Sequence, residues 1–359
     1  MKYLNALNKI NGVGSQKVRT LLNFFGSAEK AWQAGLDELK ASGVSEAIAE
    51  KIYTERNNID PDAEWKRMQK ENVKMITFDM PEYPRLLKEI ANPPYTIYMK
   101  GDIDLNATPM IAIVGSRKFT AYGSQVATTF ARDLSAAGIT VVSGMALGID
   151  AIAHQGALSV GGKTVAVLGG SLDDKNIYPR NNFNLSREII ENGALISDYP
   201  IETPAGLQGN FPARNRIIAG LALGTLIIEA GEKSGTLITA NLALESNREV
   251  FAVPGSIFSP QSAGTNTLIK KGAKVVTSVK DILEELNLGE YSETAAIIPK
   301  VPETKEEEIL LKILSADPLH IDNISKLAKL ETATVASALS MMEIKGWIKN
   351  IGGQNYILL

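Results

Sequence analysis

The 359-residue sequence contains no cysteine and only two histidines, His154 and His320. Without cysteine there can be no disulfide, no thiolate-bound zinc and no cysteine nucleophile. A histidine-based metal centre or a Ser-His-Asp triad would have to use one of the two histidines. We therefore expect neither kind of catalytic site.

The sequence also lacks an excess of charge of one sign and any long apolar run. Lys and Arg number 37 against 40 Asp and Glu, a formal net charge of -3. This balance excludes a protein surface that is basic throughout, as some nucleic-acid-binding proteins have. A site for an anion must therefore be a local basic patch. No stretch reaches the roughly 18 unbroken apolar residues of a membrane span, and the N-terminus lacks the apolar run of a signal peptide. We expect a soluble, cytoplasmic protein with no membrane partner.

The length allows about two or three domains at roughly 150 residues each, and 45% hydrophobic residues allow a substantial core. Five zones differ in pattern. They are short helices with glycine turns (1–56), a connecting region leading into a sheet (57–109), alternating strands and helices (110–286), a linker rich in Pro, Thr and Glu (287–304), and amphipathic helices ending in a glycine hairpin (305–359).

The first zone contains a glycine turn followed by a helical apolar face. Gly12 and Gly14 flank Val13, and the pattern returns at Gly43, where Ser45 stands in place of a second glycine. The spacing resembles helix-hairpin-helix motifs of the SAM-like kind, which are common in DNA-associated proteins. Such a turn exposes backbone N–H groups on which a phosphate can dock, although a plain helical turn with a glycine cap explains the same residues.

The third zone predicts an α/β fold: a Rossmann-like, doubly wound and mainly parallel sheet. Its apolar runs are rich in Val, Ile and Leu and are separated by helix-length segments, which indicates strands covered on both faces. The predicted strands are 111–114, 139–143, 164–169, 194–197, 225–230, 249–253 and 274–278.

This zone has no cofactor signature. Gly115-Ser116-Arg117 follows the first strand where a dinucleotide fold needs G-x-G-x-x-G, and the second strand ends without the acid that binds ribose. A relaxed Walker A pattern at 157–164 lies between a helix and a following strand, the reverse of the order that a P-loop requires. We expect no NAD, no intrinsic ATPase activity and no cofactor.

Polar turns follow several of the predicted strands. They carry Gly or Ser together with Arg or Lys, and one of them, at 232–236, would open a helix with Ser-Gly-Thr. Because open α/β sheets bind ligands at the carboxyl ends of their strands, these turns indicate a shallow positive site for phosphates. Tyr178 and Phe211 flank the basic turns and either stack on bases or belong to the core.

The ordered motifs GSR, SGMALGIDAIAHQGAL, VAVLGGSLDDKNIYP, FPARNRIIAGL, EAGEKSGTLITANLALE, VFAVPGS and GTNTLIKKGA strongly resemble the DNA-processing protein A (DprA/Smf) family. The segment YPRLLKEIANPPYTIYMKG matches as well, so the resemblance covers about residues 1–286. It implies single-stranded DNA binding, protection of incoming DNA, homodimerisation and delivery of the strand to the recombinase RecA during natural transformation, without catalysis.

By motif, the resemblance implies that Arg117, Lys175 and the basic residues of PARNR contact DNA. Together with the polar turns, the candidate DNA-binding residues are Gly115, Ser116, Arg117, Lys175, Asn176, Arg214, Asn215, Arg216, Lys233, Ser234, Gly235 and Thr236. Self-association in the family lies toward the end of the central domain, so Leu268 and Ile269 are candidates for a dimer interface; ordinary core packing is the alternative.

The last zone fits a winged-helix domain, which the family often carries. The presumed recognition helix, about 332–345, has Lys345 as its only basic residue, and a wing turns at Gly352-Gly353. Readers of the major groove usually present Arg, Lys, Asn or Gln. The composition therefore favours protein contact or weak DNA contact.

Two other functions stay open at this point. One is a phosphate-binding enzyme, because the Ser-Gly-Thr turn resembles the PGG-x-GT-x-x-E turn of nucleotide phosphoribohydrolases. Leu237-Ile238-Thr239 follow here, however, and supply no carboxylate. The other is a duplex-DNA regulator acting through the winged helix, which would leave the basic turns unexplained.

Overall fold

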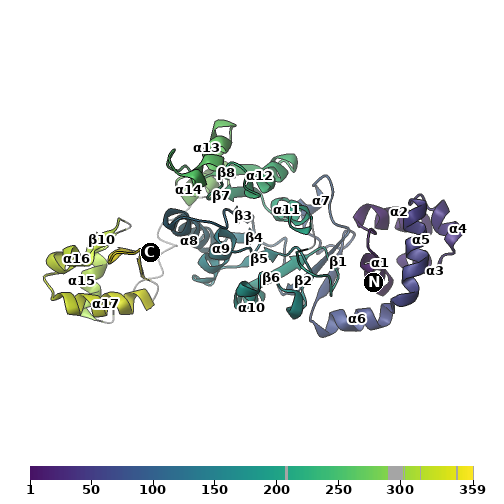
Figure 1. Cartoon of the computed structure of the whole chain (residues 1–359), viewed down its shortest axis with the longest axis horizontal. Helices are drawn as coiled ribbons and strands as arrows, with labels where there is room; N and C mark the ends of the chain where they lie inside the picture. The colour runs from purple at the N-terminus through teal and green to yellow at the C-terminus, as the bar shows by residue number, and fades with distance from the viewer. Residues whose placement is uncertain (207–208, 290–301, 303, 316, 345–346, 359) are drawn as a thin grey trace. The chain divides into compact units, whose positions relative to one another are not determined.

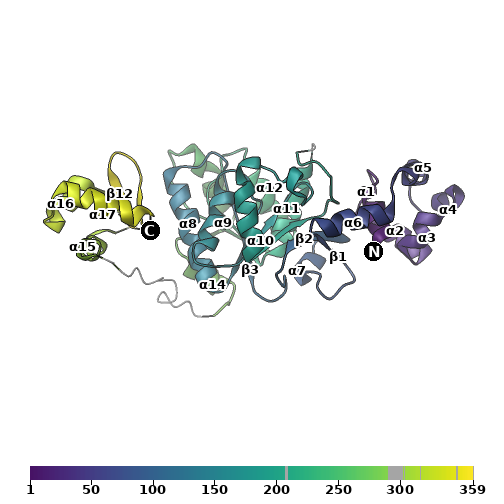
Figure 2. The same ribbon diagram turned by 90° about the horizontal axis from the view of Figure 1, so that it is seen from below.

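The computed structural model describes residues 1–206, 209–289, 302, 304–315, 317–344 and 347–358. Contacts divide the chain into two compact units, one ending at residue 291 and the other beginning at 292 (Figures 1 and 2). This division falls inside the predicted linker 287–304, most of which lies outside the described residues. Among the described residues, no helix is both long enough and apolar enough to span a bilayer.

The N-terminal zone is helical, as its pattern predicted. The first glycine turn joins α1 to α2, and the second pattern joins α4 to α5. The Ser15 hydroxyl at the start of α2 accepts a hydrogen bond from the backbone N–H of Tyr95 at 2.9 Å, so this turn contacts the segment that leads into the sheet. The helices are α1 (Lys2–Lys9), α2 (Ser15–Phe25), α3 (Ala28–Gln33), α4 (Leu36–Ala41) and α5 (Glu46–Glu55), followed by the 3-10 turn η1 (Arg56–Asn58).

A nine-stranded sheet forms the centre of the first unit, with the strand order β1-β2-β6-β5-β4-β3-β7-β8-β9. β1 pairs antiparallel with β2, and β2 with β6; every other pair is parallel. The strands are β1 (Lys74–Thr77), β2 (Thr96–Gly101), β3 (Met110–Val114), β4 (Thr140–Ser143), β5 (Thr164–Val167), β6 (Gly193–Ser197), β7 (Gly224–Ile227), β8 (Glu249–Ala252) and β9 (Lys274–Val275). All seven predicted strands are confirmed, with ends shifted by a few residues.

The region 57–109 corrects one expectation, because it is more than a connection. It contains α6 (Pro61–Lys70), β1, α7 (Arg85–Lys88) and β2, and so adds two strands to the sheet. Their runs KMIT and TIYMKG are short, and β2 finds its partner in β6, almost 100 residues later in the sequence. Both runs mix Lys or Thr with their apolar residues, so neither has the continuous apolar pattern of a buried parallel strand.

Helices cover both faces of the sheet, which explains why its central strands are buried along their whole length. α7, α11, α12 and α13 pack on one face, and α8, α9, α10 and α14 pack on the other, where α10 contacts β5, β6 and α9 (Figure 1). Their bounds are α8 (Ala121–Ala136), α9 (Ile149–Leu158), η2 (Asp174–Asn176), η3 (Arg180–Asn182), α10 (Phe183–Asn192), α11 (Asn210–Leu221), α12 (Thr236–Glu245), η4 (Pro260–Ser262), α13 (Ala263–Lys270) and α14 (Val279–Glu285).

The second unit is a winged-helix domain. Its three-stranded sheet has the order β10-β12-β11, and Gly352 and Gly353 form the wing turn with positive φ angles of 102° and 59°. α17 occupies the place of the predicted recognition helix and buries Val335, Leu339 and Met342 against the domain core. The elements are α15 (Lys305–Ile313), β10 (Leu319–His320), α16 (Ile321–Ala328), α17 (Thr332–Ile344), β11 (Ile348–Asn350) and β12 (Asn355–Leu358).

Candidate functional site

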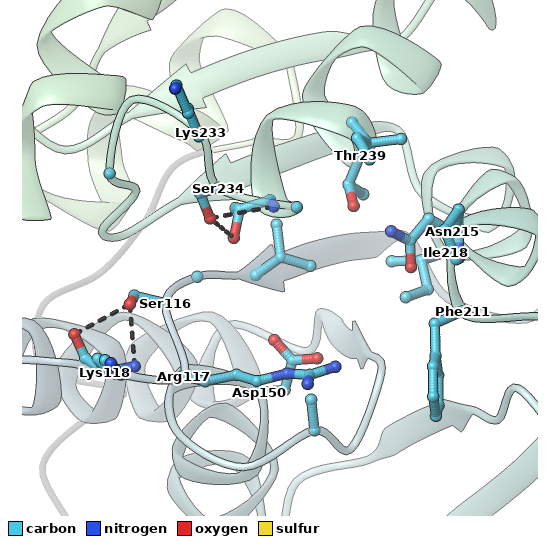
Figure 3. Close-up of a pocket in the computed structure, with 18 of the residues that line it drawn as sticks. Ser116, Arg117, Lys118, Asp150, Phe211, Asn215, Ile218, Lys233, Ser234 and Thr239 are labelled. Carbon is cyan, nitrogen blue, oxygen red and sulfur yellow. Dashed lines mark hydrogen bonds between the residues drawn. The ribbon is translucent and has the colours of Figure 1, made fainter. Parts of the chain in front are cut away.

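A cleft of about 620 Å³ opens at the carboxyl edge of the parallel strands (Figure 3). The loops that follow β3 and β7 form two of its walls. β3 and β7 are neighbours from which the chain winds in opposite directions, toward β6 on one side and β9 on the other. Open α/β sheets bind their ligands at such a switch point, so the position of the cleft marks it as the candidate site.

Nine of the twelve candidate DNA-binding residues line this cleft, although they come from three separate segments. They are Gly115, Ser116, Arg117, Arg214, Asn215, Lys233, Ser234, Gly235 and Thr236. The cleft also has lining residues that sequence reasoning missed: Lys118, Ile218, Ile238, Thr239, Pro260 and Gln261. Lys118 directly follows the GSR motif, and this position is a signal from which it could be predicted as a DNA-binding residue. Pro260 and Gln261 have no distinctive sequence signal.

The other three candidates lie outside the cleft lining. Lys175 is exposed, and its ammonium lies 3.4 Å from the Glu202 carboxylate. The Asn176 amide donates to Asp173 at 2.7 Å, and Arg216 forms an ion pair with Asp198 at 2.6 Å. In this structure all three side chains therefore have protein partners.

Arg214 is a buried residue, only 4% exposed. Its guanidinium donates to the backbone carbonyls of Gly144, at 2.8 Å, and Val167. Gly144 directly follows β4, and Val167 is the last residue of the neighbouring strand β5. Burial lowers the pKa of Arg214 to about 10, opposed by the carboxylate of Asp150 and aided by the charge of Arg117. Arg214 thus holds the loops after β4 and β5 in place and adds positive charge beneath the cleft.

Asp150 balances part of that buried charge. Burial raises its pKa, while the charge of Arg214 and the N–H groups of Ala146, Gly144 and Gly115 act in the opposite direction. A carboxylate that accepts several backbone N–H groups serves to fix loops. We therefore interpret Asp150 as the residue that ties the loop after β3 to the loop after β4.

Arg117 and Lys118 are exposed on the loop after β3. The Ser116 hydroxyl accepts from the Lys118 N–H at 3.0 Å and donates to the Lys118 carbonyl at 2.9 Å, which closes a tight turn. Figure 3 shows Arg117 extending across the cleft toward Phe211, whose ring centre lies 5.8 Å from the guanidinium. Among the described residues, no carboxylate lies within ion-pair distance of Arg117, Lys118 or Lys233. These three cations are available to an anionic ligand.

Aromatic side chains stand next to these cations. Phe211 lines the cleft, and its ring centre lies 5.7 Å from that of Tyr178, which is 50% exposed. A second, small cavity is lined by Phe211 together with Arg117 and Tyr178. Rings that face solvent beside cations can stack on bases.

The loop after β7 leads into the start of α12. Ser234, Gly235 and Thr236 lie there, and the hydroxyl of Ser234 accepts from the N–H of Thr236 at 3.2 Å. The positive end of the helix dipole faces the cleft from this position. No acidic residue follows within the first turn of α12, since Leu237, Ile238 and Thr239 occupy it.

Both histidines hydrogen-bond to neighbouring residues of the described structure. His154 is fully buried on α9 with its Nδ1 2.7 Å from the Thr164 hydroxyl. His320 accepts the N–H of Asp322 at 3.3 Å and caps α16, as expected for a structural residue. Among the described residues, no group of three or more His, Cys, Asp or Glu side chains could hold a metal.

Comparison with known proteins agrees with this architecture. The profile described as DNA recombination-mediator protein A matches residues 74–287, more than half of the chain. The chain belongs to this family. The profile of the DprA winged helix domain matches residues 296–354.

Relatives and solved structures extend the match. Protein Smf from Synechocystis sp. is 36% identical over 391 residues, which cover 99% of this chain and 98% of that protein. The X-ray structure of DprA from Streptococcus pneumoniae has a TM-score of 0.68 and 35% identity, over 79% of this chain and 98% of that one. A DprA structure from Helicobacter pylori, described for its single-stranded DNA binding mode, has a TM-score of 0.54 and 34% identity, over 60% of this chain and 96% of that one.

Proposed function

We propose that this DprA family member binds single-stranded DNA in the cleft through its phosphate backbone. The observation that carries the proposal is the group of three exposed cations, Arg117, Lys118 and Lys233, without carboxylate partners among the described residues, above the buried charge of Arg214. Single strands are held by a charged groove combined with aromatic platforms, and Phe211 and Tyr178 supply the rings. The solved Helicobacter pylori relative, described as binding single-stranded DNA, supports this choice of ligand.

The remaining candidates extend the same proposal. Lys175 is largely exposed and carries only a long ion pair to Glu202, so a phosphate can compete for it at low cost, because exposed pairs contribute little. Lys175 and Asn176 are proposed contacts for a strand that continues beyond the cleft. Arg216 is already paired with Asp198, which leaves it a weaker candidate than Lys175.

The bound strand would be protected and handed to RecA during natural transformation, with two copies of the chain acting as a homodimer. This part of the proposal rests on membership of the recombination-mediator family. No chemical step is required, and we propose a non-catalytic role. A phosphoribohydrolase-like activity lacks its carboxylate, since Ile238 and Thr239 line the cleft after the Gly-Thr turn.

Binding of labelled single-stranded and duplex oligonucleotides, measured by fluorescence anisotropy, tests the proposal. We expect the single strand to bind more tightly, because the bases of a duplex are paired and cannot reach Phe211 and Tyr178. Equal affinity, or a preference for duplex, would contradict it and would favour the winged-helix regulator instead.

A further inference from the structure

The loop between β8 and η4 presents two bulky apolar side chains to solvent. Ile257 is 84% exposed and Phe258 is 89% exposed, the highest values among the large apolar side chains of the described residues. Single exposed apolar residues are ordinary on protein surfaces. Two consecutive large apolar side chains that are almost wholly exposed indicate a surface that binds a ligand.

The backbone of this loop is fixed by hydrogen bonds, so its side chains are held outward. Asn266 of α13 both accepts from the Gly255 N–H, at 3.3 Å, and donates to the Gly255 carbonyl, at 3.0 Å. The N–H of Ser259 bonds to the carbonyl of Ser256 at 3.0 Å, which closes the turn around Ile257 and Phe258. A fixed loop loses little conformational entropy when a ligand binds to it.

The loop adjoins the cleft. Pro260 and Gln261, which follow it, line the cleft, and the Gln261 carbonyl accepts from the N–H of Ala230 after β7 at 2.8 Å. On the other side, the hydroxyl of Tyr122 donates to the carbonyl of Pro254 at 2.9 Å. The exposed surface is therefore continuous with the wall that carries the cations.

Two more exposed aromatic residues belong to the same edge. Phe119 and Tyr122 follow the GSR loop and remain exposed. We call Phe119, Tyr122, Ile257 and Phe258 the apolar rim. Lys118 precedes Phe119 directly and lines the cleft, so the rim begins where a bound phosphate backbone would leave it.

We propose that the apolar rim is a second contact surface for single-stranded DNA, on which bases of the strand emerging from the cleft stack, with Phe258 as the main platform. This inference rests on the proposed function of the cleft. The combination favours a single strand because the exposed rings begin directly beside the cation Lys118, and a strand presents a base face and a phosphate at every nucleotide.

The test combines variants of the rim with oligonucleotides that lack bases. We would measure the affinity of the full chain for a single strand longer than the about 4–16 nucleotides that such sites cover, and for the same strand with a block of abasic nucleotides at either end. Phe258→Ala should weaken binding of the complete strand about five- to thirtyfold, the lower part of the range for a lost base–aromatic stack. Phe258→Tyr is the matched control and should bind like the wild type.

The abasic strands decide between stacking and other causes. One of the two abasic blocks should weaken binding by the wild type but leave Phe258→Ala unaffected, because the same contact cannot be lost twice. Phe258 is so exposed that its truncation leaves the fold intact.

Arg117→Ala, measured in parallel, separates this inference from the proposed function. If Arg117→Ala weakens binding while Phe258→Ala matches the wild type on every strand, the rim proposal is overturned and the cleft stands. If the wild type shows no single-strand binding, both fall. If Phe258→Ala changes the molecular mass measured by light scattering, the rim is an interface between copies of the chain, which also overturns the proposal.

Discussion

Arg117 and Arg214 lie near enough for their charges to oppose each other, yet their surroundings differ. Arg117 is exposed, with its guanidinium 5.8 Å from the ring centre of Phe211, whereas Arg214 is buried and donates to the carbonyls of Gly144 and Val167. Removing an exposed cation changes ligand affinity, while removing a buried one leaves carbonyl groups and Asp150 without a partner. Affinity for DNA is therefore best tested at Arg117.

His154 gives the first unit a pH-dependent stability. Burial, together with the charge of Arg214, lowers its pKa from 6.5 to about 3. Between these values the unfolded chain binds a proton that the folded chain does not, so the free energy of unfolding falls as the pH drops below 6.5. The expected loss at pH 5 is about 2 kcal/mol.

Urea unfolding of the wild type and of His154→Gln at pH 7 and pH 5 checks this. The wild type should lose more stability between the two pH values than the variant does. Asp150 and Asp198, whose pKa values are raised by burial, contribute with the opposite sign but are present in both proteins. The same pH dependence in both would show that His154 is not the titrating group.

At the scale of single elements, the loop after β3 depends on Gly148 in the loop after β4. Gly148 has a φ of +90°, and a Cβ there would lie 2.5 Å from the Ser116 carbonyl oxygen and 2.8 Å from the Cα of Arg117. Only glycine allows both the backbone conformation and the close approach. The two loops therefore fit together only with glycine at this position.

Gly148→Ala should lower both stability and DNA affinity. The strained φ costs about 1 kcal/mol or more, and the new methyl group displaces the loop that carries Arg117. Gly138→Ala is the matched control, because Gly138 has a φ of +80° and nothing within 4 Å of a Cβ. Thermal unfolding should show a loss in both variants, and anisotropy should show weaker single-strand binding in Gly148→Ala alone; unchanged binding in that variant would contradict the account.

The elements also show what the sequence could predict. The seven parallel strands and most of the cleft followed from apolar runs with polar turns at their ends, because the carboxyl ends of parallel strands meet at one edge. β1 and β2 were missed because their runs KMIT and TIYMKG are short and mix Lys and Thr with apolar residues, unlike the continuous apolar runs of the parallel strands. The burial of Arg214 could not be predicted either, since it depends on Asp150 and on the carbonyl groups of Gly144 and Val167, which are distant from Arg214 in the sequence.

At the scale of the whole molecule, we predict that the interface of the homodimer lies at the β9 edge of the sheet. Of the two candidate residues, Leu268 is buried in the core, whereas Ile269 is half-buried at the end of α13. Val275 on the adjacent edge strand β9 is 45% exposed. An exposed edge strand with an apolar side chain is a surface on which a second copy can pair.

Val275→Glu should therefore yield a monomer where the wild type is a dimer, because the interface would bury an unpaired carboxylate. Light scattering coupled to size exclusion gives the mass directly. Leu244→Glu makes the same change at an exposed apolar residue on α12 and should leave the dimer intact. A dimeric mass for Val275→Glu would place the interface elsewhere.

The most direct test of the central claim is a salt series of single-strand binding with the wild type, Arg117→Ala and Lys163→Ala. Lys163 immediately precedes β5 at the opposite edge of the sheet, so its variant removes the same charge away from the cleft. Arg117→Ala should lose about 1–3 kcal/mol of binding free energy and reduce the salt dependence by about one phosphate contact; Lys163→Ala should bind like the wild type. Wild-type affinity in Arg117→Ala, or equal losses in both variants, would contradict a phosphate-binding cleft at the switch point.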